Sequence, residues 1–255
     1  MHLTTALCTI ILFMTLIWCW YLVSKNPAVV DVAWPIGLML LGLMDLLITI
    51  SWKNGLFCIL LIIWGGRLAS FLWWTRIRLN IHDKRYTQLD TSWCLSADIA
   101  FLLHYQLQGL LILIISLPWF FIAKNPILTR LDLLGILLAL AAIGAETLAD
   151  WQLLRFKKHH KGQVCNQGLW QYSRHPNYFF EWLTWCAFTL CALPTSWGWL
   201  AVLSPLTLYL IMTKITAPMT EQGSIKARGK AYLDYQRVTP LFFPKFINLN
   251  GIFYE

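Results

Sequence analysis

The sequence predicts an all-α, polytopic membrane protein: a bundle of about seven transmembrane helices with a short cytoplasmic C-terminal helix. The chain is 58% hydrophobic and only 13% charged, a balance that a soluble domain of 255 residues does not need. Apolar runs long enough to cross a bilayer recur along it. Basic residues collect in alternate connections between these runs, which is typical of multi-pass proteins.

The apolar runs predict seven spans that form one membrane domain over residues 1–255. The connections between spans are short, except at 76–97, at 155–177 and in the tail after Lys214. With ends placed to within several residues, the spans are Leu3–Val23, Ala28–Ile50, Leu56–Thr75, Asp98–Ala123, Asp132–Leu154, Tyr178–Leu193 and Trp197–Ile215.

The net charge of +8 has its simplest explanation in topology signals and in contact with anionic lipid headgroups. The basic residues are scattered over membrane-proximal loops, so we expect no nucleic-acid partner. The seven cysteines contain no C-x-x-C pair, and most lie in apolar runs, so we expect neither a disulfide framework nor a metal site. Neither a G-x-G-x-x-G nor a Walker loop is present, which argues against Rossmann and P-loop nucleotide sites.

The most informative stretch is 167–181, where a basic loop leads into an apolar helix. Arg174 and His175 precede that helix, and its free amides and dipole favour an anion. Asn177 and Glu181 are four residues apart and therefore share one helical face. An anion-binding rim above a polar stripe indicates a phosphate-bearing cofactor that reaches into a membrane protein.

The fifth predicted span carries a second polar stripe. Glu146, Asp150 and Lys157 are spaced so that all three lie near one face of a helix. The carboxylates suit amide or ribose hydroxyl groups, and Lys157 suits a phosphate. A structural ladder of ion pairs is the competing explanation, and the sequence leaves both open.

The second predicted span carries Asp31 near its cytoplasmic end. As a buried acid it would face a substrate cavity and donate a proton; as a structural residue it would snorkel or pair with an arginine such as Arg67 of the third span. After that third span, residues 82–86 (His-Asp-Lys-Arg-Tyr) are polar enough to form either a lid or an ordinary solvated loop.

The tail predicts an amphipathic helix between Thr220 and Leu241, after Lys214. It carries Tyr232 and Tyr235, three residues apart. Such a helix lies on the membrane as a headgroup anchor or closes over a bound cofactor.

Several of these segments together resemble a bacterial protein of the DUF1295 family, which belongs with the steroid 5α-reductase-like membrane reductases. The similarity runs from about Pro27 to Pro244. It rests on Val29–Gly37, Lys84-Arg85-Tyr86, Ala149–Gln152, Gly168–Glu181 and Gly229–Pro244. The resemblance implies a seven-helix bundle in a bacterial inner membrane, which binds NADPH from the cytosol and admits a lipid substrate laterally.

The resemblance also implies roles for single residues. Asn177 and Glu181 match the Asn and Glu near the nicotinamide end, and Asp150 matches an acidic cofactor contact. Lys157 stands where an Arg would meet a phosphate, and Glu146 replaces an Asn. The cofactor-binding set that we expect is Glu146, Asp150, Lys157, Tyr172, Arg174, His175, Asn177, Tyr178, Glu181, Glu221 and Tyr235.

For catalysis, the resemblance aligns Asp31 roughly with a Glu that polarises the substrate carbonyl. The partnering Tyr of the third span is not evident; Trp64 is nearest, and an indole cannot act as a carbonyl acid. We therefore expect Asp31 as the catalytic residue, with membrane lipids as surroundings and a lipid or steroid-like molecule as substrate.

The expected function is NADPH-dependent reduction of a C=C bond conjugated to a carbonyl in a steroid-like or other lipid. One alternative is a methyltransferase of the isoprenylcysteine carboxyl methyltransferase type, whose S-adenosylmethionine would also lie under Arg174 and His175. The other is a non-catalytic lipid-binding protein. Only a dinucleotide needs the extra polar stripe of Glu146, Asp150 and Lys157.

We predict that the N-terminus lies outside and the C-terminus in the cytoplasm. Sixteen of the 20 Lys and Arg fall on the side of the C-terminus and three on the other, and positive residues stay inside. Reporter fusions at Glu255 test this orientation. Activity of a reporter that works only in the periplasm would contradict it.

Overall fold

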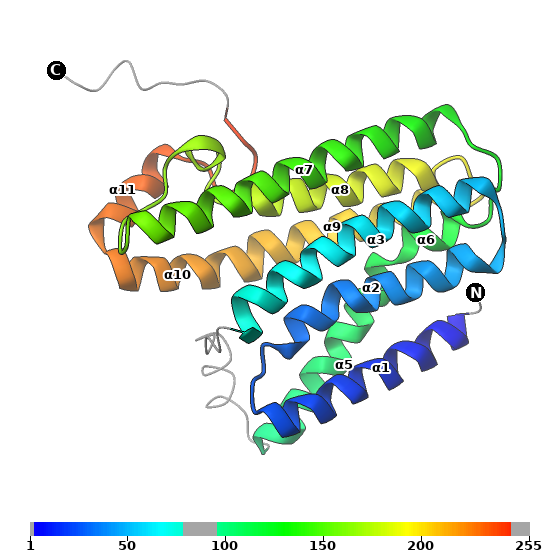
Figure 1. Ribbon diagram of the computed structural model, residues 1–255, viewed down its shortest axis with the longest axis horizontal. Helices are drawn as coiled ribbons and strands as arrows, with labels where there is room; N and C mark the ends of the chain where they lie inside the picture. Colours follow the sequence, from blue (N-terminus) through cyan, green and yellow to red (C-terminus); the bar gives the residue numbers. More distant parts are fainter. Residues whose placement is uncertain (1–2, 79–95, 246–255) are drawn as a thin grey trace. The chain divides into compact units, whose positions relative to one another are not determined.

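The computed structural model describes residues 3–78 and 96–245, and this part of the chain is helical with no strand (Figure 1). The longer helices are α1 (Leu3–Ser24), α2 (Val29–Ile48), α3 (Trp52–Leu72), α5 (Ala97–Ile115), α6 (Leu117–Ile122), α7 (Arg130–His159), α8 (Pro176–Ala192), α9 (Leu203–Ile211), α10 (Ala217–Arg228) and α11 (Lys230–Val238). Short 3₁₀ and π turns join or extend them: η1 (Trp73–Arg78), η2 (Gly168–Gln171), η3 (Gly198–Val202) and η4 (Met212–Thr216). The predicted lid at 82–86 lies outside the described residues.

In the part of the chain that the structure describes, six helical stretches are long and apolar enough to cross a membrane, so the prediction of about seven spans was close. They are Leu3–Ser24, Val29–Ile48, Trp52–Arg78, Ala97–Ile122, Arg130–His159 and Gly198–Arg228. The remaining predicted span corresponds to α8, which has only 17 residues. An all-helical chain is what the bilayer requires, because a helix satisfies its own backbone hydrogen bonds.

The last span is longer than predicted. It continues through η4 and α10 to Arg228, because the polar residues after Lys214 change the surface of the helix without interrupting its backbone. The break comes at Gly229, whose φ of 54° lies in the left-handed region that glycine adopts without a steric penalty. The predicted amphipathic tail helix is therefore divided between α10 and α11.

The chain forms two compact units, and their boundary falls inside α7, α8 and α9. Unit 1 contains residues 1–136 and 187–207, and unit 2 contains residues 137–186 and 208–255. The single domain expected from the sequence stays a prediction, since compact units can belong to one membrane domain.

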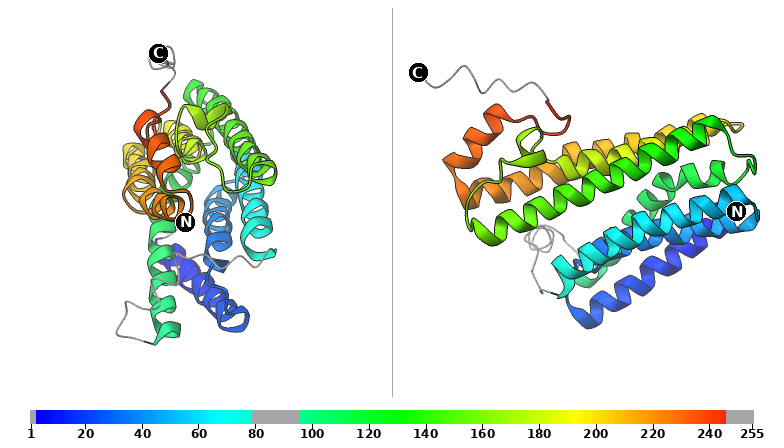
Figure 2. Two further views of the ribbon diagram at one scale, coloured as in Figure 1. Left: turned by 90° about the vertical axis from the view of Figure 1, so that its left-hand side faces the viewer. Right: turned by 45° about the horizontal axis from the view of Figure 1, so that its top comes forward.

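Unit 1 is organised around α2, the most enclosed of the candidate spans. Within its apolar window 61% of the residues are buried, against 22% for α1. It packs against α1, α3, α5 and α6, and Figure 2 shows α1, α2, α3 and α5 side by side. Gly42 and Gly65 permit close contacts: a Cβ at Gly42 would lie 2.5 Å from Leu61, and one at Gly65 would lie 2.4 Å from Met39.

A buried ion pair joins α3 to the first turn of α7 in unit 1. Lys53 Nζ lies 3.1 Å from Asp132 Oδ1, and both side chains are almost fully buried. Asp132 Oδ2 also accepts the backbone N–H and the hydroxyl of Thr129, each at 2.7 Å, while Thr129 Oγ1 accepts the Asp132 N–H. This reciprocal capping arrangement begins α7 and fixes the direction of its long axis within unit 1.

Unit 2 consists of the rest of α7 and α8, the end of α9, and α10, α11 and the tail. Its aromatic core joins α8 and α9 to the tail through Phe179, Trp182, Tyr209 and Phe242, whose neighbouring rings have centroids 5.2–6.3 Å apart. After Gly229, α11 turns away from α10 (Figure 2). The loop before α8 contacts α7 through Gln152, α10 through Glu221 and α11 through Tyr235.

We predict that Asp132→Asn destabilises the protein by about 3–5 kcal/mol. The amide oxygen still accepts from Thr129, so the cap survives, but Lys53 is left as a buried charge without its counter-charge. Thermal unfolding in detergent measures the loss.

The control is the double variant Lys53→Met with Asp132→Asn, which removes both charges. We expect it to recover most of the lost stability. A double variant as unstable as the single one would show that the ion pair is not the cause.

Candidate functional site

The centre of the candidate site is the carboxylate of Glu221 in α10, which binds groups from two other segments. Its Oε1 lies 2.8 Å from Arg174 Nε and 3.2 Å from His175 Nε2. The same oxygen accepts the Tyr232 hydroxyl at 3.4 Å, and Oε2 accepts Gln236 Nε2 at 2.7 Å. Glu221 thus connects the loop before α8 with α10 and α11.

Arg174 and His175, predicted as an anion-binding rim, therefore have a carboxylate partner within the protein. The backbone further fixes Arg174, because its Nη1 donates to the Gln236 carbonyl at 3.1 Å and its N–H donates to the Pro240 carbonyl. His175 stacks on Tyr178 with ring centroids 4.9 Å apart. The expected cofactor role of Arg174, His175 and Glu221 stays a prediction.

A second set of contacts fastens the loop before α8 to α11 and the tail. The Tyr235 hydroxyl donates to the carbonyls of Trp170 and Ser173, and burial raises the pKa of this phenol, so it stays a donor at neutral pH. Ser173 Oγ donates to the Phe242 carbonyl at 2.8 Å, and the Lys245 N–H donates to the Tyr172 carbonyl at 2.9 Å. Tyr172 and Tyr235 thus lie in the site, and these hydrogen bonds hold the loop before α8 in place.

The polar groups that best fit a ligand are Asp150 of α7 and Asn177 of α8. Asn177 Nδ2 donates to Asp150 Oδ1 at 3.2 Å. A carboxylate only accepts hydrogen bonds, so the amide nitrogen must face it, which determines the orientation of Asn177. Asn177 Oδ1 is then a buried acceptor, and no described residue donates to it.

Glu181 lies one turn after Asn177 and is buried. Its Oε1 accepts the indole N–H of Trp185 at 3.0 Å, so its carboxylate is held along α8. Glu146 and Asp150 are also buried, one turn apart on α7, whereas Lys157 is exposed at the end of the same helix. The predicted polar stripe therefore lies on one face of α7. Its two carboxylates are buried, and Lys157 at the end of the helix is exposed.

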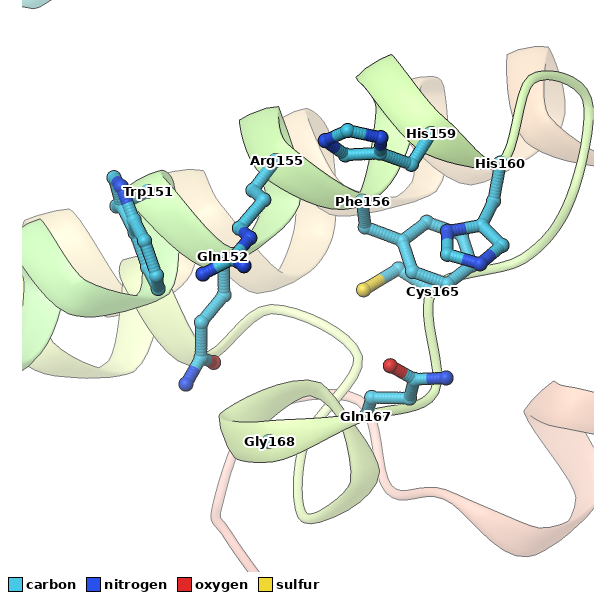
Figure 3. A pocket seen from close by; sticks show the side chains of 9 residues that line it. All are labelled: Trp151, Gln152, Arg155, Phe156, His159, His160, Cys165, Gln167 and Gly168. Carbon is cyan, nitrogen blue, oxygen red and sulfur yellow. The ribbon is translucent and has the colours of Figure 1, made fainter.

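A pocket of about 490 Å³ lies between the last turns of α7 and the loop that leads to η2 (Figure 3). The side chains around it are those of Trp151, Gln152, Arg155, Phe156, His159, His160, Cys165, Gln167 and Gly168. Sequence reasoning missed this pocket, because its wall depends on contacts between the loop and Gln152 and not on a periodic pattern. The available signal was the segment 155–161 at the end of a span, in which six of seven residues are Arg, Lys or His.

Local contacts explain why the loop forms this wall. Gln152 Oε1 accepts the Leu169 N–H at 2.9 Å, and Trp170 Nε1 donates to the Ala149 carbonyl at 2.9 Å. Gly168 has a φ of 59°, and a Cβ there would lie 2.6 Å from the Gln152 side chain. Burial raises the pKa of the Cys165 thiol in this wall, so the thiol stays protonated and packs as an apolar group at neutral pH.

Asp31, the predicted catalytic acid, belongs to unit 1. Its carboxylate accepts a hydrogen bond from the Arg76 guanidinium in an ion pair that is partly exposed. His104 and Tyr105 of α5 lie within electrostatic range of it. Arg76 in η1, nine residues beyond Arg67, thus pairs with Asp31. The proton-donor role of Asp31 stays a prediction.

Of the predicted cofactor residues, the structure brings nine into contacts within unit 2. The contacts link Asp150 with Asn177, Arg174 and His175 with Glu221, His175 with Tyr178, and Tyr235 with the loop that contains Tyr172; Glu181 follows Asn177 on α8. Glu146 and Lys157 share α7 with Asp150. The cofactor roles themselves stay predictions.

Comparison with known proteins gives one match. The family model described as "Protein of unknown function (DUF1295)" matches residues 17–239, which is most of the chain. No curated protein matches the chain, and no solved structure matches it.

We predict that Glu221→Gln lowers the stability of the protein by about 2 kcal/mol, because hydrogen bonds to charged groups contribute about 1.5–3 kcal/mol. The variant leaves Arg174 without a counter-charge while its shape is preserved. Thermal unfolding, together with the rate of proteolysis of the tail, measures the effect.

The matched control is Asp234→Asn, which removes a carboxylate from an exposed pair with Arg237. Exposed pairs contribute less than about 1 kcal/mol, so we expect little change. Equal losses for the two variants would contradict the central position of Glu221.

Proposed function

The chain belongs to the DUF1295 family, and we propose that it is a membrane oxidoreductase that uses NADPH to reduce a C=C bond conjugated to a carbonyl in a steroid-like or other lipid substrate. The observation that carries the proposal is the Asp150–Asn177 hydrogen bond, which leaves Asn177 Oδ1 as a buried acceptor that no described residue satisfies. An unsatisfied buried acceptor costs about 1–3 kcal/mol, and a ligand with an N–H group would remove that cost.

The polar side chains on the facing sides of α7 and α8 fit a dinucleotide. Asn177 Oδ1 would accept from the carboxamide of the nicotinamide, and Glu181, one turn on, would lie beside the same ring. Glu146 would meet hydroxyl groups, and Lys157, about 16 Å from Glu146 along α7, would meet a phosphate. The bound cofactor would supply the hydride; the protein would supply orientation and exclude water.

The polar stripe of α7 supports the dinucleotide over S-adenosylmethionine. Both cofactors would lie near Arg174 and His175, which bind Glu221 in this structure, so these two residues do not separate the functions. Only a dinucleotide also needs the stripe that contains Asp150. In this proposal Arg174, His175, Tyr178 and Tyr235 hold the loop and helix start that surround the cofactor.

The substrate carbonyl needs a polar group as enolate charge develops on its oxygen. We assign this role to Asp31, which as a carboxylic acid would donate a proton to that oxygen. A non-catalytic lipid-binding function would not explain the buried acceptor Asn177 Oδ1, because such a function requires no ligand with an N–H group there. Orientation in a bacterial inner membrane, with this site on the cytoplasmic side, is part of the proposal.

We predict that NADPH stabilises the purified protein more than NADH, because Lys157 and Lys158 are exposed at the end of α7 and suit a 2′-phosphate. Asn177→Ala should weaken NADPH binding about tenfold, the equivalent of one net hydrogen bond. Glu181→Gln should weaken it while retaining the acceptor for Trp185. Thermal-shift titration gives these affinities.

Asn166→Ala is the matched control, since Asn166 is exposed in the loop of the same unit. It should bind NADPH like the unchanged protein. A response to S-adenosylmethionine alone would replace the reductase by the methyltransferase. Normal nucleotide binding by folded Asn177→Ala protein would remove Asn177 from the site.

We predict that Asp31→Asn retains NADPH binding and lowers turnover about 10²–10⁴-fold, which is the range of general-acid contributions. A panel of conjugated lipid enones is first tested with the unchanged protein. NADPH oxidation is then measured with the enone that this protein reduces fastest.

The structural alternative is the ion pair with Arg76. In that case Asp31→Asn lowers the melting temperature, and Arg76→Gln added to it restores the melting temperature and the turnover together. A stable Asp31→Asn protein with full turnover would remove Asp31 from the reaction.

A further inference from the structure

The pocket at the end of α7 has basic and aromatic walls. Arg155 lies over the Trp151 ring, with its guanidinium carbon 5.0 Å from the ring centroid, and His160 stacks on Phe156 at 4.6 Å. None of the lining residues is acidic. Within the described residues, neither Arg155 nor His159 has a carboxylate partner. The pocket therefore carries positive charge that the protein leaves uncompensated.

The pocket faces away from the proposed cofactor residues. Arg155 is five residues after Asp150, or about 140° around the helix, and His159 is about 180° from it. Burial agrees with this geometry, because Asp150 is buried and Arg155 is exposed. Arg155 and His159 therefore lie on a different face of α7 from Asp150 and its partner Asn177.

An exposed apolar stripe on α7 leads directly to the pocket. Leu137, Leu140, Leu148 and Trp151 are 67%, 44%, 44% and 52% exposed. Their spacing puts all four within about 60° of the direction of Arg155. Gly144 lies on the same stripe, and a Cβ there would meet no atom within 4 Å. The stripe is thus an open apolar surface that ends at a basic pocket.

The dimensions match one leaflet of a bilayer. From Gly144 to Arg155 the helix rises about 16 Å, roughly half of the hydrocarbon core. The whole of α7 has 30 residues and is about 45 Å long, so its basic end projects into the headgroup region. Trp151 then lies at the depth where tryptophan is enriched in membrane proteins.

We propose that this pocket binds the phosphate-bearing headgroup of an anionic phospholipid, whose acyl chains lie along the exposed stripe of α7. Arg155, His159 and His160 contact the phosphate, and Gln152 and Gln167 offer hydrogen bonds to the rest of the headgroup. The site is separate from the proposed cofactor site and does not depend on it. Charge and the adjoining apolar stripe together select a lipid over a soluble anion.

The test uses the purified full-length protein in a non-ionic detergent. Short-chain phosphatidylglycerol, short-chain phosphatidylcholine and inorganic phosphate are titrated separately, and the melting temperature is followed. We expect saturable stabilisation by phosphatidylglycerol and at least tenfold weaker responses to the other two. Equal responses to the two lipids would overturn selection by charge, and an equal response to phosphate would overturn the lipid in favour of a soluble anion.

Variants locate the site. Arg155→Ala with His159→Ala should weaken phosphatidylglycerol binding at least tenfold, whereas Lys226→Ala with Lys230→Ala, which removes two exposed charges elsewhere in unit 2, should not. Arg155→Lys should retain part of the affinity. Equal losses in both double variants would overturn the pocket in favour of diffuse attraction.

Two further measurements show whether a loss of lipid binding comes from misfolding or from a change at the cofactor site. Circular dichroism of the Arg155→Ala, His159→Ala protein should match that of the unchanged protein; if the double variant does not fold, Arg155→Gln alone is titrated against the same threshold. NADPH should bind the variant as it binds the unchanged protein. Displacement of the lipid by NADPH would show that the pocket belongs to the cofactor and would overturn the separate site.

Discussion

Unit 2 depends on one carboxylate. Glu221 binds Arg174, His175, Tyr232 and Gln236, so one acidic group holds α10, α11 and the start of α8 together. Without it, the Arg174 guanidinium would lose its counter-charge at the start of α8. The Tyr235 hydroxyl donates to the Ser173 carbonyl, and the Ser173 hydroxyl donates to the Phe242 carbonyl, so α11 and the tail also hold the loop before α8.

The long helix α7 then presents two different surfaces from one backbone. One face carries Glu146 and Asp150 toward α8, where Asn177 is oriented by Asp150. The opposite face is apolar and exposed until it reaches Arg155 and the basic pocket (Figure 3). Because an α-helix repeats every 3.6 residues, opposite faces of α7 form a buried polar site and a lipid-facing surface within one helix.

Sequence reasoning was accurate where the physics is local. The shared face of Glu146 and Asp150 follows from helical spacing, and the all-helical class follows from apolar runs in a bilayer. It failed where partners are distant in sequence: Glu221 is 46 residues from His175, and Lys53 is far from Asp132. It also missed the pocket, because the wall from Cys165 to Gly168 depends on Gln152 and on a left-handed glycine rather than on any periodic pattern.

The central claim is that a dinucleotide binds at the Asp150–Asn177 face of unit 2. Hydrogen exchange of the purified protein with and without NADPH tests it most directly, since exchange reports which backbone segments become protected. The account predicts that NADPH slows exchange in residues 168–181 and in the part of α7 from Glu146 to Lys157, and that S-adenosylmethionine does not. No protection by NADPH, or protection of these segments by S-adenosylmethionine alone, would contradict it.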